Sequence, residues 1–122
     1  MTAGSCHCGT VRFTVPAPPD EVTECHCSIC SKLGSLCCYY PPDQFAITQG
    51  EAELSIYRWG DRLLDFRFCS RCSAMIGWRI HPGLEEECYP GGVGARVGVN
   101  ARLIDGIDAR ALPRRVIAGA PQ

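Results

Sequence analysis

The sequence predicts a mainly β protein that forms one compact domain over residues 1–122. A chain of 122 residues can form one hydrophobic core, and a second domain would be too small to bury enough apolar surface. The 46% of hydrophobic residues can form a hydrophobic core, and the 13 Gly and 9 Pro indicate many turns between short elements. Apolar side chains also alternate along several short segments, as they do in half-buried strands. We therefore expect short strands and few long helices.

The first half of the chain is predicted to contain strands that end at proline or glycine. From Thr10 to Val15 the side chains alternate, so Val11, Phe13 and Val15 should share the buried face. A short helical turn is expected over residues 28–34, with Gly34 ending it. Further extended segments are predicted over residues 21–27, 36–40 and 45–48.

The second half is predicted to begin with a β-hairpin that turns at Gly60 and Asp61. Its arms are residues 54–59 and 63–68, and Leu64, Phe66 and Phe68 should share one face. The glycine-rich residues 91–94 lack the spacing and the following helix of a phosphate-binding loop, so a turn is expected there. The remaining predictions are a strand at 74–80, a polar loop at 82–90 and extended segments at 95–99, 102–104 and 115–118.

Charge and hydropathy bear on nucleic-acid binding, membrane insertion and cellular location. The formal net charge is −1 and there is no basic block, so a nucleic-acid-binding surface is not expected. The N-terminus has no apolar segment typical of a signal peptide, and no apolar run is long enough to span a membrane. We therefore expect a cytoplasmic protein. In a reducing compartment, ten cysteines favour metal binding over a disulfide framework.

Seven of the ten cysteines lie in three closely spaced groups. In Cys6-His-Cys8 and Cys25-His-Cys27, residues two apart on an extended chain point to the same side, while the intervening histidines point away. A Cys-x-x-Cys turn such as Cys69 to Cys72 brings two thiolates to one tetrahedral ion. Soft thiolates at this density favour zinc, with iron as the open alternative. The seven candidate metal ligands are Cys6, Cys8, Cys25, Cys27, Cys30, Cys69 and Cys72.

Seven thiolates divide into one set of four and one set of three. Four protein ligands form a closed structural zinc site, whereas three leave a position open for water or substrate. An eighth thiolate from Cys37, Cys38 or Cys88 would instead close the second site. We expect Cys37 and Cys38 to be small buried hydrophobes inside an apolar run, and Cys88 to be a bystander in a polar loop. The spacing does not establish which groups share an ion.

These motifs together resemble the glutathione-dependent formaldehyde-activating enzyme family, also called the centromere-protein-V-like family. The matching segments are Gly4-Ser-Cys-His-Cys-Gly9, Cys25-His-Cys-Ser-Ile-Cys30 with Gly34-Ser35, Phe68-Cys-Ser-Arg-Cys72 and Val99-Asn-Ala-Arg-Leu-Ile-Asp-Gly106. The resemblance implies a β-tent fold, a structural zinc at Cys6, Cys8, Cys69 and Cys72, and an open zinc at Cys25, Cys27 and Cys30. The sequence departs from the family pattern at Ser73, where a glycine is usual, and in the loop from Gly83 to Pro90.

The resemblance implies a zinc-dependent carbon–sulfur lyase that acts on a small thiol adduct. The family is named for adding glutathione to formaldehyde, which gives S-hydroxymethylglutathione. The catalytic centre would then be the open zinc at Cys25, Cys27 and Cys30. The alternative is a non-enzymatic zinc module that binds a protein partner, and a fourth protein cysteine at the second site would favour it. Arg67 and Arg71 are expected to be solvated surface residues, and His26 to have a packing or hydrogen-bonding role.

Overall fold

The computed structural model describes residues 1–118 and is mainly β, as predicted. A three-stranded sheet has the order β1-β2-β5, and a seven-stranded sheet has the order β10-β3-β4-β9-β8-β7-β6. Neighbouring strands are antiparallel except for β10, which runs parallel to β3. The strands are β1 (Thr2–Ser5), β2 (Arg12–Val15), β3 (Val22–Cys25), β4 (Cys37–Tyr40), β5 (Ala46–Gln49), β6 (Leu54–Tyr57), β7 (Leu64–Cys69), β8 (Met75–Ile80), β9 (Val97–Asn100) and β10 (Arg114–Ile117). The α-helices are α1 (Ser28–Leu33) and α2 (Glu85–Cys88), and five single 3₁₀ turns lie between strands.

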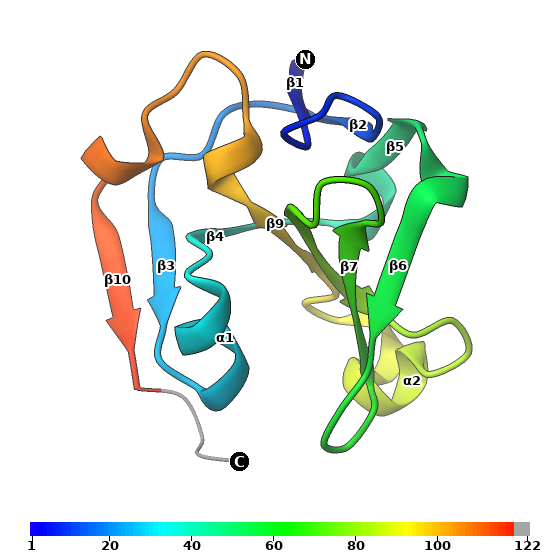
Figure 1. Cartoon of the computed structure of the whole chain (residues 1–122). Coiled ribbons are helices and arrows are strands. Elements are labelled where there is room, and N and C mark those ends of the chain that lie inside the picture. Colours follow the sequence, from blue (N-terminus) through cyan, green and yellow to red (C-terminus); the bar gives the residue numbers. More distant parts are fainter. Residues whose placement is uncertain (119–122) are drawn as a thin grey trace.

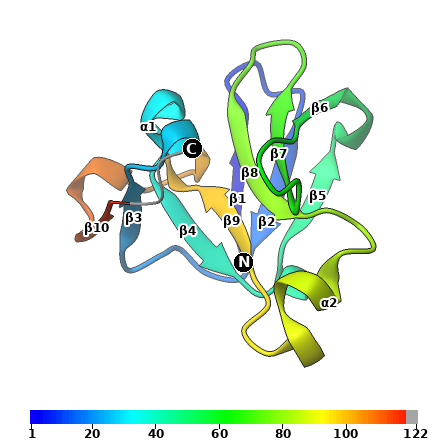
Figure 2. The ribbon, with the colours of Figure 1, turned by 90° about the horizontal axis from the view of Figure 1, so that it is seen from below.

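The large sheet is bent into two arms that stand apart like the sides of a tent. Figure 1 shows β10 and β3 on one side, with α1 beside them, and β7 and β6 on the other side. Strands β4 and β9 pair with each other where the arms meet, and Figure 2 shows this junction from below. The three-stranded sheet lies across the top of the tent in Figure 1. A cavity lies between α1 and the β7 arm.

The main core lies between the two sheets. Val11, Phe13 and Val15 are fully buried, as their alternation predicts, and they pack with Val22 and Val99. Strand β4 divides its side chains between two environments: Cys38 and Tyr40 belong to this core, whereas Cys37 and Tyr39 line a cavity on the other face. The predicted burial of Cys38 is therefore confirmed, and Cys37 is only half buried.

Strand β1 was not expected from the sequence, because its residues are short and show no apolar alternation. Its position depends on β2: Gly4 lies opposite Phe13 in the antiparallel register. A Cβ atom at Gly4 would lie 2.3 Å from the Phe13 ring, so only glycine lets that ring pack across the strand. Packing of the Phe13 ring against Gly4, more than strand propensity, therefore keeps β1 in the sheet.

Most predicted elements are present, with two corrections. The helical turn over residues 28–34 is α1, and Gly34 ends it with φ at 66°, as expected. The predicted extended segment at 102–104 is wrong, because Ala101–Leu103 form a 3₁₀ turn in which the Asn100 side chain accepts a hydrogen bond from the Arg102 amide. The predicted polar loop at 82–90 contains α2. None of the helices in the described part of the chain has the length and apolar character needed to cross a membrane.

Both faces of β7 are buried, which the sequence pattern did not predict. Leu64 and Phe66 lie on one face, and Asp65 and Arg67 occupy the other with side chains that are 0% and 7% exposed. Asp65 accepts hydrogen bonds from Arg79 Nε at 3.1 Å and His81 Nδ1 at 2.7 Å, and Arg58 Nε lies 3.5 Å away. Burial raises the pKa of Asp65, but the hydrogen bonds from His81 and Arg79 outweigh it and hold the pKa below its usual value.

Candidate metal centres

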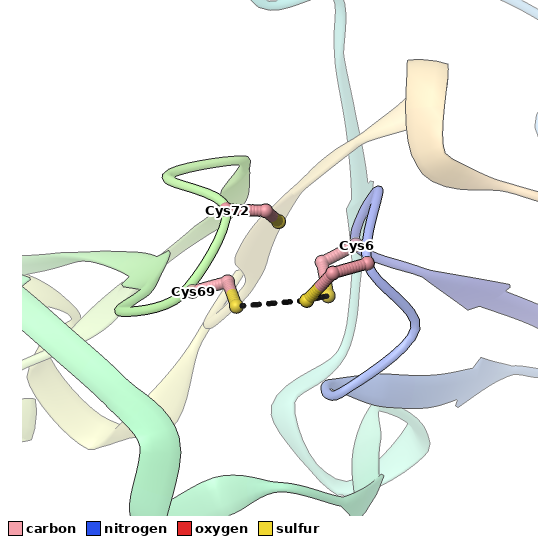
Figure 3. Close-up of side chains that lie close together, drawn as sticks. Cys6, Cys69 and Cys72 are labelled. Carbon is pink, nitrogen blue, oxygen red and sulfur yellow. Dashed lines mark hydrogen bonds between the residues drawn. The ribbon is translucent and has the colours of Figure 1, made fainter.

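The first cluster consists of Cys6, Cys8, Cys69 and Cys72, whose sulfur atoms all lie within 4.8 Å of one another. Figure 3 shows Cys69, at the end of β7, and Cys72, on the turn after it, facing Cys6 on the loop after β1. The Cys6 and Cys8 sulfurs are 3.6 Å apart, and those of Cys8 and Cys69 are 3.7 Å apart. A tetrahedral Zn²⁺ with Zn–S bonds of about 2.3 Å requires sulfur separations of about 3.8 Å. The donor set therefore fits a zinc ion.

Amide groups around the first cluster donate hydrogen bonds to the sulfur atoms of its cysteines. Val11 N–H donates to Cys6 Sγ at 3.3 Å, and Arg71 N–H donates to Cys69 Sγ at 3.4 Å. Burial raises the pKa of Cys72, but amide donors, of Ala74 first, outweigh it and lower the pKa to about 6. Hydrogen bonds with Thr10 lower the pKa of Cys8. Thiolate ligands with such donors are typical of structural zinc knuckles.

The second cluster consists of Cys25, Cys27 and Cys30, whose sulfurs also lie within 4.8 Å of one another. Cys25 ends β3, Cys27 is the N-cap of α1, and Cys30 lies in the first turn of that helix. The Cys30 amide donates to Cys27 Sγ at 3.4 Å. Burial alone would raise the pKa of Cys27, but this amide donor and neighbouring thiols lower it. Burial and the neighbouring thiols raise the pKa of Cys30.

His26 points away from the second cluster, as the alternation predicts. Its Nε2 atom lies 2.7 Å from Glu24 Oε2, and its side chain is 52% exposed. Glu24 also pairs with Arg114 of β10 at 2.6 Å. His26 therefore belongs to a surface hydrogen-bond network that includes the parallel edge strand.

The second cluster opens into a cavity of about 270 Å³ between α1 and the β7 arm, which we call the thiol cavity. Its apolar wall includes Leu64, Phe66, Met75 and Trp78, and its polar side chains include Ser35, Tyr39 and Asp61. Aromatic side chains are natural ligand walls because they exclude water over a large area. Tyr39, Trp78 and Asp61 were not predicted from the sequence as site residues, although Tyr39 alternates with Cys37 and Asp61 occupies the predicted hairpin turn.

No fourth side chain of residues 1–118 joins the second cluster. Cys37 lies in the wall of the thiol cavity but outside the group of mutually close sulfurs, and burial raises its pKa to about 11. Cys38 faces the core, and Cys88 lies on α2. Within the described residues, the structure thus brings the seven thiols together as one group of four and one group of three, as the sequence predicted.

Of the two arginines that were expected at the surface, Arg67 and Arg71, only Arg71 lies there. Arg67 is buried, so its assignment as a solvated surface residue is wrong; it occupies the face of β7 that packs against Phe45. Arg71 is exposed and lies 3.6 Å from Glu53, as a surface residue should. The cation beside the thiol cavity is Arg96, whose guanidinium carbon lies 3.9 Å from the centroid of the Tyr39 ring. A cation at this distance stacks on the ring and fixes its position.

The fold and the two clusters define a β-tent protein with one closed and one open thiolate site suited to zinc. The chain belongs to the glutathione-dependent formaldehyde-activating enzyme family, whose model matches residues 1–102. It is 35% identical over 103 residues to a putative glutathione-dependent formaldehyde-activating enzyme of Halomonas elongata, an alignment that covers 74% of this chain and 62% of that protein. The chain thus spans less than two thirds of that relative.

The fold is also similar to a crystal structure of a Rhodobacter sphaeroides protein. The TM-score is 0.74 at 22% identity, and the match covers 93% of this chain and 99% of the other. At this identity the similarity shows the fold and does not show a shared activity.

Proposed function

We propose that the protein binds a small thiol at the second cluster and catalyses the reversible addition of that thiol to a small aldehyde. The observation that carries this proposal is a cluster of three thiols, without a fourth ligand in residues 1–118, at the wall of a cavity. The description of the family names both reactants, glutathione and formaldehyde, and their adduct is S-hydroxymethylglutathione. In the reverse direction the reaction is a carbon–sulfur lyase reaction.

The donor set of the second cluster suits zinc, because three cysteines leave one tetrahedral position for a ligand. Zinc bound there would lower the pKa of a coordinated thiol and so supply a thiolate at neutral pH. Three protein thiolates already give such a site a net negative charge, so an anionic ligand needs a cation nearby. Arg96 is that cation, and we propose that it pairs with a carboxylate of the thiol ligand.

Tyr39 and Trp78 are proposed to orient the ligand. Their ring centroids are 6.1 Å apart, and the two side chains line the same cavity as the second cluster. Burial raises the pKa of Tyr39 to about 12, so its hydroxyl stays protonated at neutral pH and can donate a hydrogen bond to the aldehyde oxygen. The indole of Trp78 excludes water, which competes with the thiol for the aldehyde.

The proposed reaction moves one proton. The thiol releases its proton to solvent as it binds. Its sulfur then forms a bond to the carbonyl carbon, the C=O π bond breaks, and one proton is returned to the oxygen, which becomes the new hydroxyl group. Asp61 lines the cavity, and its Oδ1 accepts a hydrogen bond from the Leu63 amide at 3.1 Å. This bond fixes the orientation of the carboxylate, and we propose that Asp61 passes that proton from solvent to the oxygen.

Calorimetric titration of the protein loaded with two zinc ions tests thiol binding. Glutathione should bind more tightly as the pH rises toward its thiol pKa, because the site takes the deprotonated sulfur. S-methylglutathione is the matched control, since it keeps both carboxylates and has no ionisable thiol. Equal affinity for the two compounds would remove sulfur coordination from the proposal.

NMR exchange measurements on S-hydroxymethylglutathione test the chemistry separately. The protein should accelerate exchange with free formaldehyde, and Asp61→Asn should reduce that acceleration while leaving glutathione affinity largely unchanged. Binding of glutathione without faster exchange would support the thiol-binding site and refute the reaction with formaldehyde. A fourth protein sulfur found on the second zinc by X-ray absorption would favour the non-enzymatic module that binds a protein partner.

A further inference from the structure

A second cavity of about 340 Å³, which we call the arginine cavity, lies on the opposite face of β7 from the thiol cavity. Phe66 and Arg67 are successive residues of this strand, so their side chains point to opposite sides of the sheet. Phe66 lines the thiol cavity and Arg67 lines the arginine cavity. The two cavities are therefore separated by the strand itself, and a ligand of one does not reach the other.

Arg67 is a buried cation without a partner in residues 1–118. Its side chain is 7% exposed, its Nε–H makes no hydrogen bond, and it takes part in none of the ion pairs of this region. Its guanidinium carbon lies 5.8 Å from the Phe45 ring centroid. A guanidinium stays charged at any physiological pH and carries five N–H donors, so burial without an acceptor is costly. The arginine cavity lies where such an acceptor would bind.

The other lining residues indicate which kind of anion fits. Arg79 also lines the cavity, but its Nε is engaged by Asp65 at 3.1 Å. Glu51 and Glu85 add two negative charges to the wall, and Glu85 Oε2 already accepts a hydrogen bond from the Gly83 amide at 2.9 Å. These carboxylates disfavour a multiply charged anion such as a phosphate ester. The remaining wall is apolar and includes Phe45, Ile47 and Val97.

We propose that the arginine cavity binds a small organic monocarboxylate, with the carboxylate on the Arg67 guanidinium and an apolar body against Phe45, Ile47 and Val97. A carboxylate matches the planar fork of a guanidinium and supplies the acceptors that Arg67 lacks. The site is independent of the thiol chemistry, because none of its residues belongs to either cysteine cluster.

The test is a titration of the full zinc-loaded chain with hexanoate, followed by NMR and calorimetry. Hexanoate should bind saturably, and hexanamide, which has the same length and no charge, should bind at least roughly tenfold more weakly. Arg67→Met keeps the volume and removes the donors, so hexanoate affinity should fall by a similar factor. Arg96→Met, at the thiol cavity, is the matched control and should leave hexanoate binding unchanged.

A surface variant keeps the test decisive if Arg67→Met does not fold. Glu51 is exposed, so Glu51→Gln should fold normally and tighten hexanoate binding by removing a repelling charge from the cavity. The proposal is overturned by absence of saturable binding at millimolar hexanoate or by equal affinity for hexanamide. Unchanged affinity in a folded Arg67→Met protein overturns it as well, and if that variant does not fold, unchanged affinity in Glu51→Gln does so. Binding that is lost in Arg96→Met instead would place the carboxylate in the thiol cavity and also overturn it.

Discussion

Ser73 holds a backbone conformation that favours glycine, and it stands where the family usually has glycine. It follows Cys72 in the turn between β7 and β8, with φ at 67°, and its amide donates to the Cys69 carbonyl at 2.9 Å. An L-residue in this left-handed region is strained by its Cβ atom. The departure from the family pattern noted in the sequence is thus a point of local strain beside the first cluster.

Replacing Ser73 with glycine should therefore stabilise the protein. The gain from relieving the left-handed strain exceeds the extra entropy of glycine in the unfolded chain, so we expect an increase of about 0.5–1 kcal/mol in the free energy of unfolding. Urea denaturation at fixed zinc concentration measures it. Ser31→Gly, inside α1, is the control and should destabilise, because glycine is a poor helix former. A destabilised Ser73→Gly would show that the hydroxyl matters more than the strain.

Gly98 determines where the Trp78 side chain lies. A Cβ atom at Gly98 would lie 2.2 Å from Trp78 Nε1, and these residues are paired across β8 and β9. Gly98→Ala should displace the indole from the thiol cavity, lower stability by about 1–3 kcal/mol and weaken glutathione binding. Thermal melting and calorimetry check both effects. Trp78→Leu removes the clashing atoms, so adding Gly98→Ala to that variant should cost little; an additive cost would refute the clash as the cause.

At the scale of elements, Asp65 joins β7 to both of its neighbours. Arg79 and His81 belong to β8 and the residue after it, and Arg58 follows β6. Three basic side chains thus converge on one carboxylate that is 0% exposed. This buried network fixes the register of the β7 arm, whose opposite face forms the wall of the thiol cavity.

Asp65→Asn should destabilise the protein by about 2–3 kcal/mol at neutral pH, because it leaves three partly buried basic side chains without their counter-ion. The folded-state pKa of Asp65 is lowered, so its contribution is fully present above the unfolded pKa of about 4 and is lost as the pH falls through the folded pKa. The difference between wild type and Asp65→Asn should therefore be constant from pH 7 to 5 and shrink below about pH 4.

Denaturant unfolding at several pH values, with wild type and variant compared at each pH, measures that difference and cancels any shared effect of zinc loss. Asp108→Asn is the control, because Asp108 pairs with Arg110 at the surface. An asparagine at this N-cap can still accept a hydrogen bond from the Arg110 amide. It should change stability little at any pH. A difference for Asp65→Asn that grows at low pH would contradict a lowered folded-state pKa of Asp65.

The two cysteine clusters should respond differently to substitution. The first cluster joins the loop after β1 to the turn after β7, so Cys69→Ala should unfold or aggregate the protein. The second cluster lies within one short segment, so Cys27→Ala should lose the second zinc and keep most strand content. Cys88→Ala, outside both clusters, is the control. Circular dichroism with a metal count checks all three, and equal collapse of Cys27→Ala would make both sites structural.

At the scale of the whole molecule, the sequence predicted the parts that depend on local pattern. Alternation identified the buried face of β2, and the close spacing of cysteines identified the seven candidate metal ligands. What it missed depends on tertiary contact: β1 is kept in the sheet by the Phe13 ring, and both faces of β7 are covered because the sheet bends. Spacing left open which cysteine groups share an ion, since that pairing depends on how the sheets are placed.

The difference in sequence span between the clusters has a consequence for synthesis on the ribosome. Cys8 and Cys69 are 61 positions apart, so the first cluster can assemble only after β7 and its turn have been made and have folded back onto the N-terminus. Cys25, Cys27 and Cys30 emerge together and much earlier, as one short loop and the start of a helix. The nascent chain thus exposes the local thiols to metal, or to oxidants, before the closed cluster exists. A metal supplied during translation would enter the open site first, and Cys69 and Cys72, which emerge later, would complete the closed cluster.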